Sequence, residues 1–302
     1  MTGTRAKAVA PADAVVRPPS RRLPAGAVDA HFHILGPEHA YPYAARRLYT
    51  PPDASLDAYR HLAETLGIAG AVIVQPSVYG SDNRRTLDAM AALGMPMRAV
   101  VVVDEDVPDG ELERLHALGA RGVRINTVFS AEAGFAAARR LAERIRPLGW
   151  HIQFLTDISA VGDLPALVGP LGLPVVFDHL GHFDAGLGTD WRGFADLVGL
   201  MADGRAWVKL SGAYRTTCRQ RLPYDDVRPI AEALIARAPG QLLWGSDWPH
   251  PSIPVPMPND GPLLDMMLDW IGDGDIIETI CVRTPRAFYG FDTSPRAEGG
   301  RA

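Results

Sequence analysis

From residue 27 onward, short runs of β-branched and aliphatic residues alternate with longer segments in which apolar residues recur at helical spacing. The short runs predict eight strands, at 27–33, 71–75, 98–104, 122–126, 151–155, 174–179, 206–211 and 241–246. The longer segments predict helices at 56–66, 84–93, 110–118, 131–147, 164–170, 191–202 and 224–238, with two more at 263–271 and 275–282. Gly67, Gly94 and Gly119 directly follow predicted helices and indicate where those helices end.

Eight β/α repeats within about 265 residues predict the α/β class and a single (β/α)8 TIM barrel over residues 26–291. An open doubly wound sheet is the alternative fold, but no glycine-rich phosphate loop follows Val28 in the first strand. Residues 1–25 mix Ala, Pro and Arg without the apolar stretch of a secretion signal, so they predict a flexible N-terminal tail. Residues 292–302 predict a short C-terminal tail.

The composition narrows the classes of function. The 302 residues include 30 basic and 35 acidic side chains. Hydrophobic residues make up 47 % of the sequence, which is too apolar for a disordered chain. A net charge of −5 argues against nucleic-acid binding, because that binding needs clustered cations. No apolar run approaches the roughly 18 to 20 residues that span a bilayer, and two cysteines cannot form a disulfide framework. We therefore expect a cytoplasmic protein that binds neither nucleic acid nor membranes; its oligomeric state is left open.

Polar side chains follow three of the predicted strands at the end where barrel enzymes carry their active sites. Asp29, His31 and His33 share one face at the end of the first strand, His179 ends the sixth, and Asp247 follows the eighth. Taken alone, His179 is explained as a packed core histidine and Asp247 as a helix cap or a loop ion pair. Their arrival at the same rim as His31 and His33 indicates a catalytic site instead.

The residues around these positions resemble the amidohydrolase superfamily. The resemblance lies in the amidohydrolase-related (amidohydrolase 2) family, and within it the chain looks most like 2-pyrone-4,6-dicarboxylate lactonases and related sugar-lactone and muconolactone hydrolases. It extends over nearly the whole barrel, and the segments that carry it are 31–33, 49–51, 74–77, 80–83, 121–126, 177–181, 207–209 and 244–250.

The resemblance implies hydrolysis of a small acidic lactone. Asp247 would take a proton from water, while His31, His33 and His179 would polarise the lactone carbonyl and stabilise the oxyanion. A carboxylate near apolar walls is a competent base once its pKa is raised, and three N–H donors can surround a developing charge.

A metal is the main alternative at this site. His31, His33, His179 and Asp247 could bind zinc or manganese. Metal-dependent relatives add a histidine at the end of the fifth strand or a carboxylated lysine at the fourth. Here the fifth strand begins with His151, and the fourth ends with Arg124 and Asn126. We therefore expect that no metal or other cofactor is required.

Arginines at the rim suit recognition of a carboxylate or sulfonate. The resemblance implies that Tyr49, Ser77, Arg124 and Arg215 contact the acidic groups of the substrate. Further candidate contacts are Gln75, Asn126, Gln153, His182, Lys209 and His250. The dicarboxylate lactonases carry one arginine a few residues after the position of Arg124 and another at the position of His182. Here residues 127–131 hold no cation and residue 182 is a histidine, so the chain has two cations fewer. A monoanionic lactone is thus as plausible a substrate as a dianionic pyrone.

Other interpretations remain open from the sequence. A sugar-lactone isomerase and a metal-dependent hydrolase or decarboxylase would use the same scaffold, and a non-catalytic binding module is the third alternative. Lys209 is the single lysine of the predicted barrel and shares a strand face with Ser211 near the rim. We expect it to be charge-paired or proton-linked near Asp247.

Overall fold

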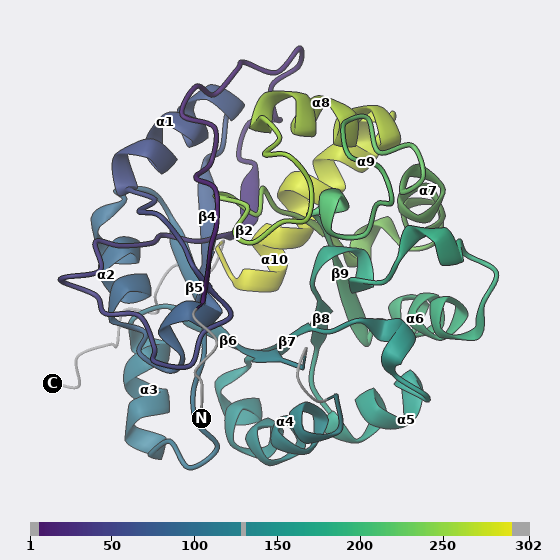
Figure 1. The fold of residues 1–302 in the computed structure, drawn as a ribbon. Helices are drawn as coiled ribbons and strands as arrows, with labels where there is room; N and C mark the ends of the chain where they lie inside the picture. The colour runs from purple at the N-terminus through teal and green to yellow at the C-terminus, as the bar shows by residue number, and fades with distance from the viewer. Residues whose placement is uncertain (1–5, 128–130, 292–302) are drawn as a thin grey trace, which may run out of the picture.

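The computed structural model describes residues 6–127 and 131–291, and a parallel eight-stranded barrel fills most of that range (Figure 1). Each strand pairs with its neighbour in the sequence, in the order β10-β9-β8-β7-β6-β5-β4-β2. The strands are β2 (Val28–Phe32), β4 (Gly70–Val74), β5 (Met97–Val101), β6 (Ala120–Asn126), β7 (His151–Leu155), β8 (Val175–Phe177), β9 (Ala206–Leu210) and β10 (Leu242–Trp244). This topology confirms the predicted (β/α)8 barrel.

Helices surround the strands, except for the last one, which crosses the middle of the view in yellow (Figure 1). They are α1 (Leu56–Leu66), α2 (Arg84–Ala92), α3 (Asp109–Ala117), α4 (Ala131–Ile145), α5 (Leu164–Val168), α6 (Arg192–Ala202), α7 (Arg228–Arg237), α8 (Asp260–Ile271), α9 (Gly274–Glu278) and α10 (Thr284–Tyr289). The sequence predicted a start of α7 at residue 224, but Tyr224 has a φ of 33°, outside the right-handed helical region. Helix α10 was not predicted as a separate element. Within the described ranges, no helix combines the length and the apolarity needed to cross a bilayer.

The strands are buried on both faces, which explains why they appear as continuous apolar runs in the sequence. Small aliphatic side chains fill the barrel interior, and a larger apolar cluster joins the strands to the helices. Helix α10 closes one end of the barrel with Phe288 and Tyr289, whose rings pack against His151 at 4.9 and 5.5 Å. His151 therefore lies at the end of β7 away from the rim, as the sequence predicted.

The first and last strands of the barrel meet at a seam made of few contacts. A single bridge pairs Phe32 with Trp248, and Asp247 N donates to His31 O at 2.8 Å. The Asp29 carboxylate accepts hydrogen bonds from the backbone N–H of His31 at 3.0 Å and of Ser246 at 2.9 Å. The seam thus fixes the end of β2 against the turn that carries Asp247.

The segment before the barrel differs from the flexible tail that the sequence predicts. β1 (Lys7–Ala8) pairs in parallel with β3 (Tyr49–Thr50), and Asn259 accepts from Arg17 N at 3.0 Å and donates to Asp13 Oδ2 at 2.8 Å. Leu23 is buried. Because these contacts lie far apart in sequence, the patterns of local periodicity contain no trace of them. Residues 1–5 and the predicted C-terminal tail, 292–302, lie outside the described residues.

Candidate active site

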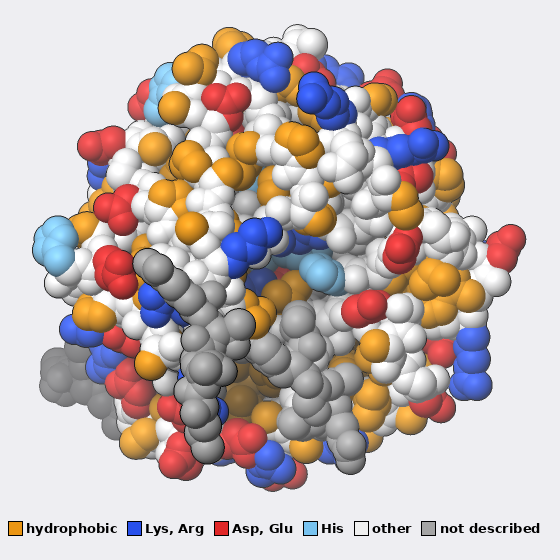
Figure 2. Space-filling model, in the orientation of Figure 1, with side chains coloured by type: hydrophobic (Ala, Val, Ile, Leu, Met, Phe, Trp, Pro, Cys, Tyr) orange, Lys and Arg blue, Asp and Glu red, His pale blue; other side chains and the backbone are white. Residues whose placement is uncertain are grey.

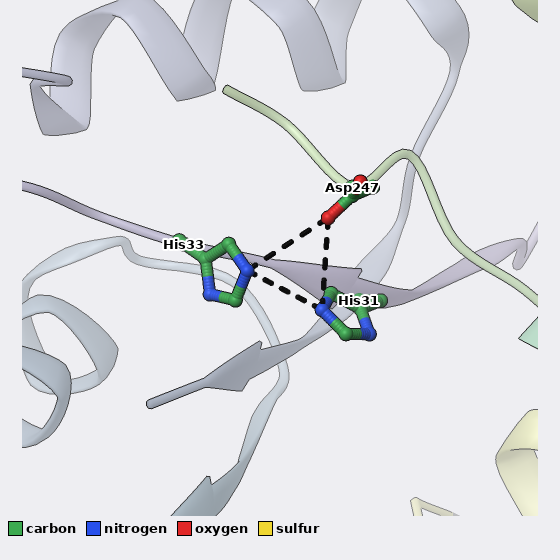
Figure 3. A group of neighbouring side chains, drawn as sticks. All are labelled: His31, His33 and Asp247. Carbon is green, nitrogen blue, oxygen red and sulfur yellow. Dashed lines mark hydrogen bonds and ion pairs between the residues drawn. The ribbon is translucent and has the colours of Figure 1, made fainter. Parts of the chain in front are cut away.

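Three strand ends bring together the four side chains predicted to react. His31 belongs to β2 and His33 follows it, while His179 follows β8 and Asp247 follows β10. All four are at most 2 % exposed. Asp247 Oδ1 lies 3.8 Å from Nε2 of His31, 3.8 Å from that of His33 and 3.9 Å from that of His179. In Figure 3 the rings of His31 and His33 and the carboxylate point toward one another. Three imidazoles thus surround one carboxylate oxygen.

A cavity of about 160 Å³ lies over this group. Figure 2 shows a hollow near the middle of this face, with basic and histidine side chains at its edge. Its walls include five residues predicted to bind substrate (Tyr49, Ser77, Arg124, Asn126 and Arg215), together with His33, His179 and Asp247. Four residues that were not predicted complete the walls: Leu48, Leu155, Pro251 and Ser252.

Five other predicted contacts do not line the cavity. Two of them, Gln75 and Gln153, are fully buried and have structural partners: Gln75 Nε2 donates to Gly80 O at 3.1 Å, and Gln153 Nε2 donates to Asp178 Oδ1 at 2.8 Å. His250 lies behind Asp247, and His182 is half-buried with its ring 6.1 Å from that of His179. The alternation of a strand predicts the face of a side chain, but not its depth in the barrel.

Lys209, the fifth of these residues, is wholly buried inside the barrel. Its Nζ donates to Ala30 O and lies 5.7 Å from the centre of the Tyr289 ring. Burial lowers the pKa of Lys209 to about 8, although the charge of Asp178 opposes that effect. The expected pairing with Asp247 is not formed; Lys209 lies beneath the site.

The outer nitrogen of each histidine faces an oxygen atom of a neighbouring residue. His33 Nδ1 lies 2.7 Å from Val74 O, His31 Nδ1 lies 3.2 Å from Asp178 Oδ1, and His179 Nδ1 lies 3.0 Å from Ser211 Oγ. A carbonyl only accepts, so His33 carries its proton on Nδ1, and in a neutral ring its Nε2 is an acceptor. The expectation of three N–H donors is therefore wrong for a neutral His33.

Burial keeps the histidines neutral. It lowers the pKa of His31, and it holds the pKa values of His33 and His179 well below the usual range. For His33, the neighbouring charge of Arg124 acts in the same direction. Asp247 and Asp178 oppose the effect of burial at His179 without overcoming it.

Asp247 is ionised, because the charge of Arg215 outweighs burial. Burial alone would raise the pKa of Asp247, but the Arg215 guanidinium holds it well below the usual range. Arg215 Nε donates to Asp247 Oδ2 at 2.7 Å, and the Tyr214 hydroxyl donates to the same oxygen at 2.8 Å. The pKa of this carboxylate is thus lowered, the opposite of what the sequence led us to expect of the base.

Arg124 forms a second buried ion pair across the barrel. Its Nε and its second terminal nitrogen lie 3.2 and 3.1 Å from Asp178 Oδ2. Burial alone would raise the pKa of Asp178, but His31 and Arg124 hold it well below the usual range. The two arginines of the cavity are therefore each paired with a buried aspartate.

The same donor atoms fit a divalent cation. Nε2 of His31 lies 3.3 Å from Nε2 of His33, and both lie within 4.8 Å of an oxygen of Asp247. Asp247 Oδ1 is buried and forms no hydrogen bond to a described residue. Imidazole nitrogen and carboxylate oxygen are suitable ligands for zinc and manganese. The lone pairs of His31 Nε2, His33 Nε2 and Asp247 Oδ1 converge with no hydrogen between them, so these three atoms offer a coordination site. Asp178 beside His31 Nδ1 corresponds to the outer carboxylate that orients many histidine ligands.

Three polar residues of the site were not predicted: Asp178, Ser211 and Tyr214. Each stands directly beside a residue or motif that the sequence did single out, since Asp178 precedes His179 and Tyr214 precedes Arg215. A polar residue just after a buried strand is the signal that could have identified Asp178 and Ser211, whereas Tyr214 lies four residues beyond β9 and gives no such signal.

This fold and site define an enzyme of the hydrolytic barrel class. The chain belongs to the amidohydrolase family, whose model matches residues 28–291. It is 36 % identical to the 2-pyrone-4,6-dicarboxylate hydrolase of Comamonas testosteroni, over 90 % of this chain and 92 % of that one. It is 37 % identical to the 4-sulfomuconolactone hydrolase of Rhizobium radiobacter, over 90 % and 93 %. It is also 30 % identical to the D-galactarolactone isomerase of Agrobacterium fabrum, over 90 % and 93 %.

Proposed function

We propose that the chain hydrolyses a small lactone that carries an acidic group. One observation carries this proposal: three imidazole Nε2 atoms surround an ionised Asp247 oxygen in a cavity whose wall includes Arg124. The relatives named for lactones span nearly the whole chain, which supports the same substrate class here.

In the proposed reaction, Asp247 Oδ1 accepts a proton from the attacking water. Its other oxygen is already held by Tyr214 and Arg215, so only Oδ1 is free. His33 Nε2 accepts the second hydrogen of that water and orients it. His31 also presents only a lone pair at Nε2, because its Nδ1 faces the Asp178 carboxylate. His179 polarises the lactone carbonyl through Nε2–H, because the Ser211 hydroxyl can donate to its Nδ1. The hydroxide adds to the carbonyl carbon, the ring C–O bond breaks, and the proton on Asp247 passes to the ring oxygen.

The proposed turnover needs no metal. Arg215 already neutralises Asp247, and the described residues place neither a histidine at the end of the fifth strand, where Leu155 stands, nor a lysine at the end of the fourth. If zinc or manganese binds, His31, His33, His179 and Asp247 would hold it, and it would polarise the carbonyl as a Lewis acid. Activity should survive exhaustive chelation, with metal content measured on the same sample. Loss of turnover that zinc or manganese restores would overturn metal independence.

The charges of the cavity favour a substrate with one acidic group. Arg124 is paired with Asp178 and Arg215 with Asp247, so each guanidinium is already half engaged before a substrate arrives. Two carboxylates on one ring would exceed this supply of positive charge. The test is a panel of 2-pyrone-4,6-dicarboxylate, 4-sulfomuconolactone and D-galactarolactone with purified protein. Turnover of none of these would refute the proposed function.

A lactone isomerase is the second candidate, supported by the 30 % identity to a D-galactarolactone isomerase. Oxygen-18 water separates the two reactions. A hydrolase gives labelled acid, whereas an isomerase that transfers the acyl group between hydroxyls gives unlabelled isomer.

Asp247→Asn tests the base directly. We expect turnover to fall about a thousandfold with the fold intact, within the range of general-base catalysis. The matched control is Asp57→Asn, because the Asp57 side chain is 90 % exposed on α1. An Asp247→Asn variant within tenfold of wild type would remove Asp247 from the mechanism.

A further inference from the structure

A chain of buried hydrogen bonds extends from Asp247 away from the cavity. The Tyr214 hydroxyl lies 2.8 Å from Asp247 Oδ2 and 2.7 Å from His250 Nδ1. His250 Nε2 lies 3.1 Å from Asp260 Oδ1, at the start of α8. None of these four residues is more than 3 % exposed.

The directions of these bonds follow from the chemistry of each group. An ionised carboxylate only accepts, so the Tyr214 hydroxyl donates its single hydrogen to Asp247. The tyrosine oxygen must then accept from His250 Nδ1–H. His250 Nε2 and Asp260 Oδ1 form the next contact of this series. The Tyr214 hydroxyl and the His250 Nδ1–H therefore both donate in the direction of Asp247.

Packing alone does not explain this chain. Phenylalanine would fill the place of Tyr214 without burying a hydroxyl, and a buried polar group is costly unless it is bonded. The backbone of the turn also needs support, because Asp247 and His250 have φ values of 59° and 57°, in the left-handed region. The hydrogen bonds from Asp247 to Asp260 connect this turn to the loop after β9 and to α8.

We propose that Tyr214 and His250, backed by Asp260, are positioning residues that hold Asp247 Oδ2 and thereby direct Oδ1 toward the three imidazoles. This inference rests on the proposed role of Asp247 as the base. A residue that acts only through Asp247 should affect kcat and leave KM nearly unchanged, because none of the three lines the cavity.

The test compares four variants with the three lactones of the panel as probes. Tyr214→Phe and His250→Phe should each lower kcat by about 10- to 100-fold, the effect of losing a hydrogen bond to a charged group. KM should stay within about threefold. The double variant should be no slower than Tyr214→Phe alone, because His250 acts through the tyrosine hydroxyl. His250→Asn should recover activity relative to His250→Phe, since its amide can donate from the position of Nδ1.

The matched control is Tyr289→Phe, because the Tyr289 hydroxyl is buried but has no hydrogen-bond partner among the described residues. Its kcat should equal that of wild type. Single variants within threefold of wild type, losses that multiply in the double variant, or no recovery in His250→Asn would each overturn the inference. If His250→Phe does not fold, the double variant Tyr214→Phe/His250→Asn replaces it. The kcat of this double variant should equal that of Tyr214→Phe alone. A wild type that opens none of the lactones refutes the proposed function as well, whereas an active wild type with unaffected variants refutes only this inference.

Discussion

Gly245→Ala tests whether the seam between the first and last strands positions the active site. A Cβ at residue 245 would lie 2.7 Å from His31 Cβ and 2.9 Å from His31 N. One of these contacts is with backbone, so no rotation of a side chain relieves the clash. The turn after β10 must therefore move away from β2, and with it Asp247, two residues farther along the chain.

The size of the effect follows from these distances. Ordinary contact begins near 3.4 Å, so the strand ends must separate by several tenths of an ångström. Overpacking of this kind costs about 1 to 3 kcal/mol of unfolding free energy, which for a chain of this size lowers Tm by about 2 to 6 °C. Misplacement of reacting groups by about 1 Å costs about a hundredfold. We therefore expect kcat to fall by about 10- to 100-fold.

Thermal unfolding and steady-state kinetics on the same preparations check this prediction. The matched control is Gly199→Ala, where a Cβ would meet nothing within 4 Å on the exposed side of α6. That variant should be more stable by about 0.5 to 1 kcal/mol, because alanine favours a helix over glycine, and equally active. A Gly245→Ala variant with wild-type kcat would refute the idea that the seam fixes the distance between His31 and Asp247.

Three further changes test other contacts. Arg124→Lys should raise KM at least tenfold for an acidic lactone and much less for an uncharged one, because lysine cannot keep the two-nitrogen contact with Asp178 while facing the cavity; equal effects on both lactones would contradict this. Asn259→Ala should lower Tm by a few degrees and speed proteolysis before residue 18, because Asn259 caps α8 and holds Asp13 and Arg17; an unchanged digestion pattern would argue against that anchor. Lys209 has a folded-state pKa of about 8, below its value of 10.5 when exposed, so its cost to stability, about 3 kcal/mol, is present below pH 8 and is lost as the pH rises toward 10.5. Urea unfolding should show that the free energy of unfolding of Lys209→Met exceeds that of wild type by more at pH 7.5 than at pH 9.5. The same difference at both pH values would refute the lowered pKa of Lys209.

The barrel was predictable because its signals are local. Strands buried on both faces give apolar runs, and glycines end the helices between them. The elements that escaped prediction depend on distant partners. α10 is defined by rings that close the barrel under His151, and residues 6–25 are held by β3 and Asn259. Neither arrangement leaves a periodic pattern in its own segment.

The active site was predictable in its members more than in its chemistry. Strand ends located His31, His33, His179 and Asp247 at one rim, and the structure brings them within 4 Å of one oxygen. The depth of each side chain was not predictable, so polar residues such as Gln75 were expected in the cavity although they hold loops. The lowered pKa of Asp247 depends on a neighbour beyond the strand ends, the guanidinium of Arg215.

That lowered pKa constrains the kind of bond the enzyme can break. A carboxylate held by Arg215 is ionised at every working pH but is a weak base, so it cannot supply much of the driving force for proton transfer. The barrier must then be lowered by polarising the carbonyl and by a ring oxygen that leaves readily, such as an enol. We therefore expect kcat/KM to fall steeply across lactones of similar size and charge as the pKa of the leaving hydroxyl rises. If kcat/KM does not change with the pKa of the leaving hydroxyl, expulsion of the ring oxygen is not rate-limiting, and binding or product release is the slow step instead.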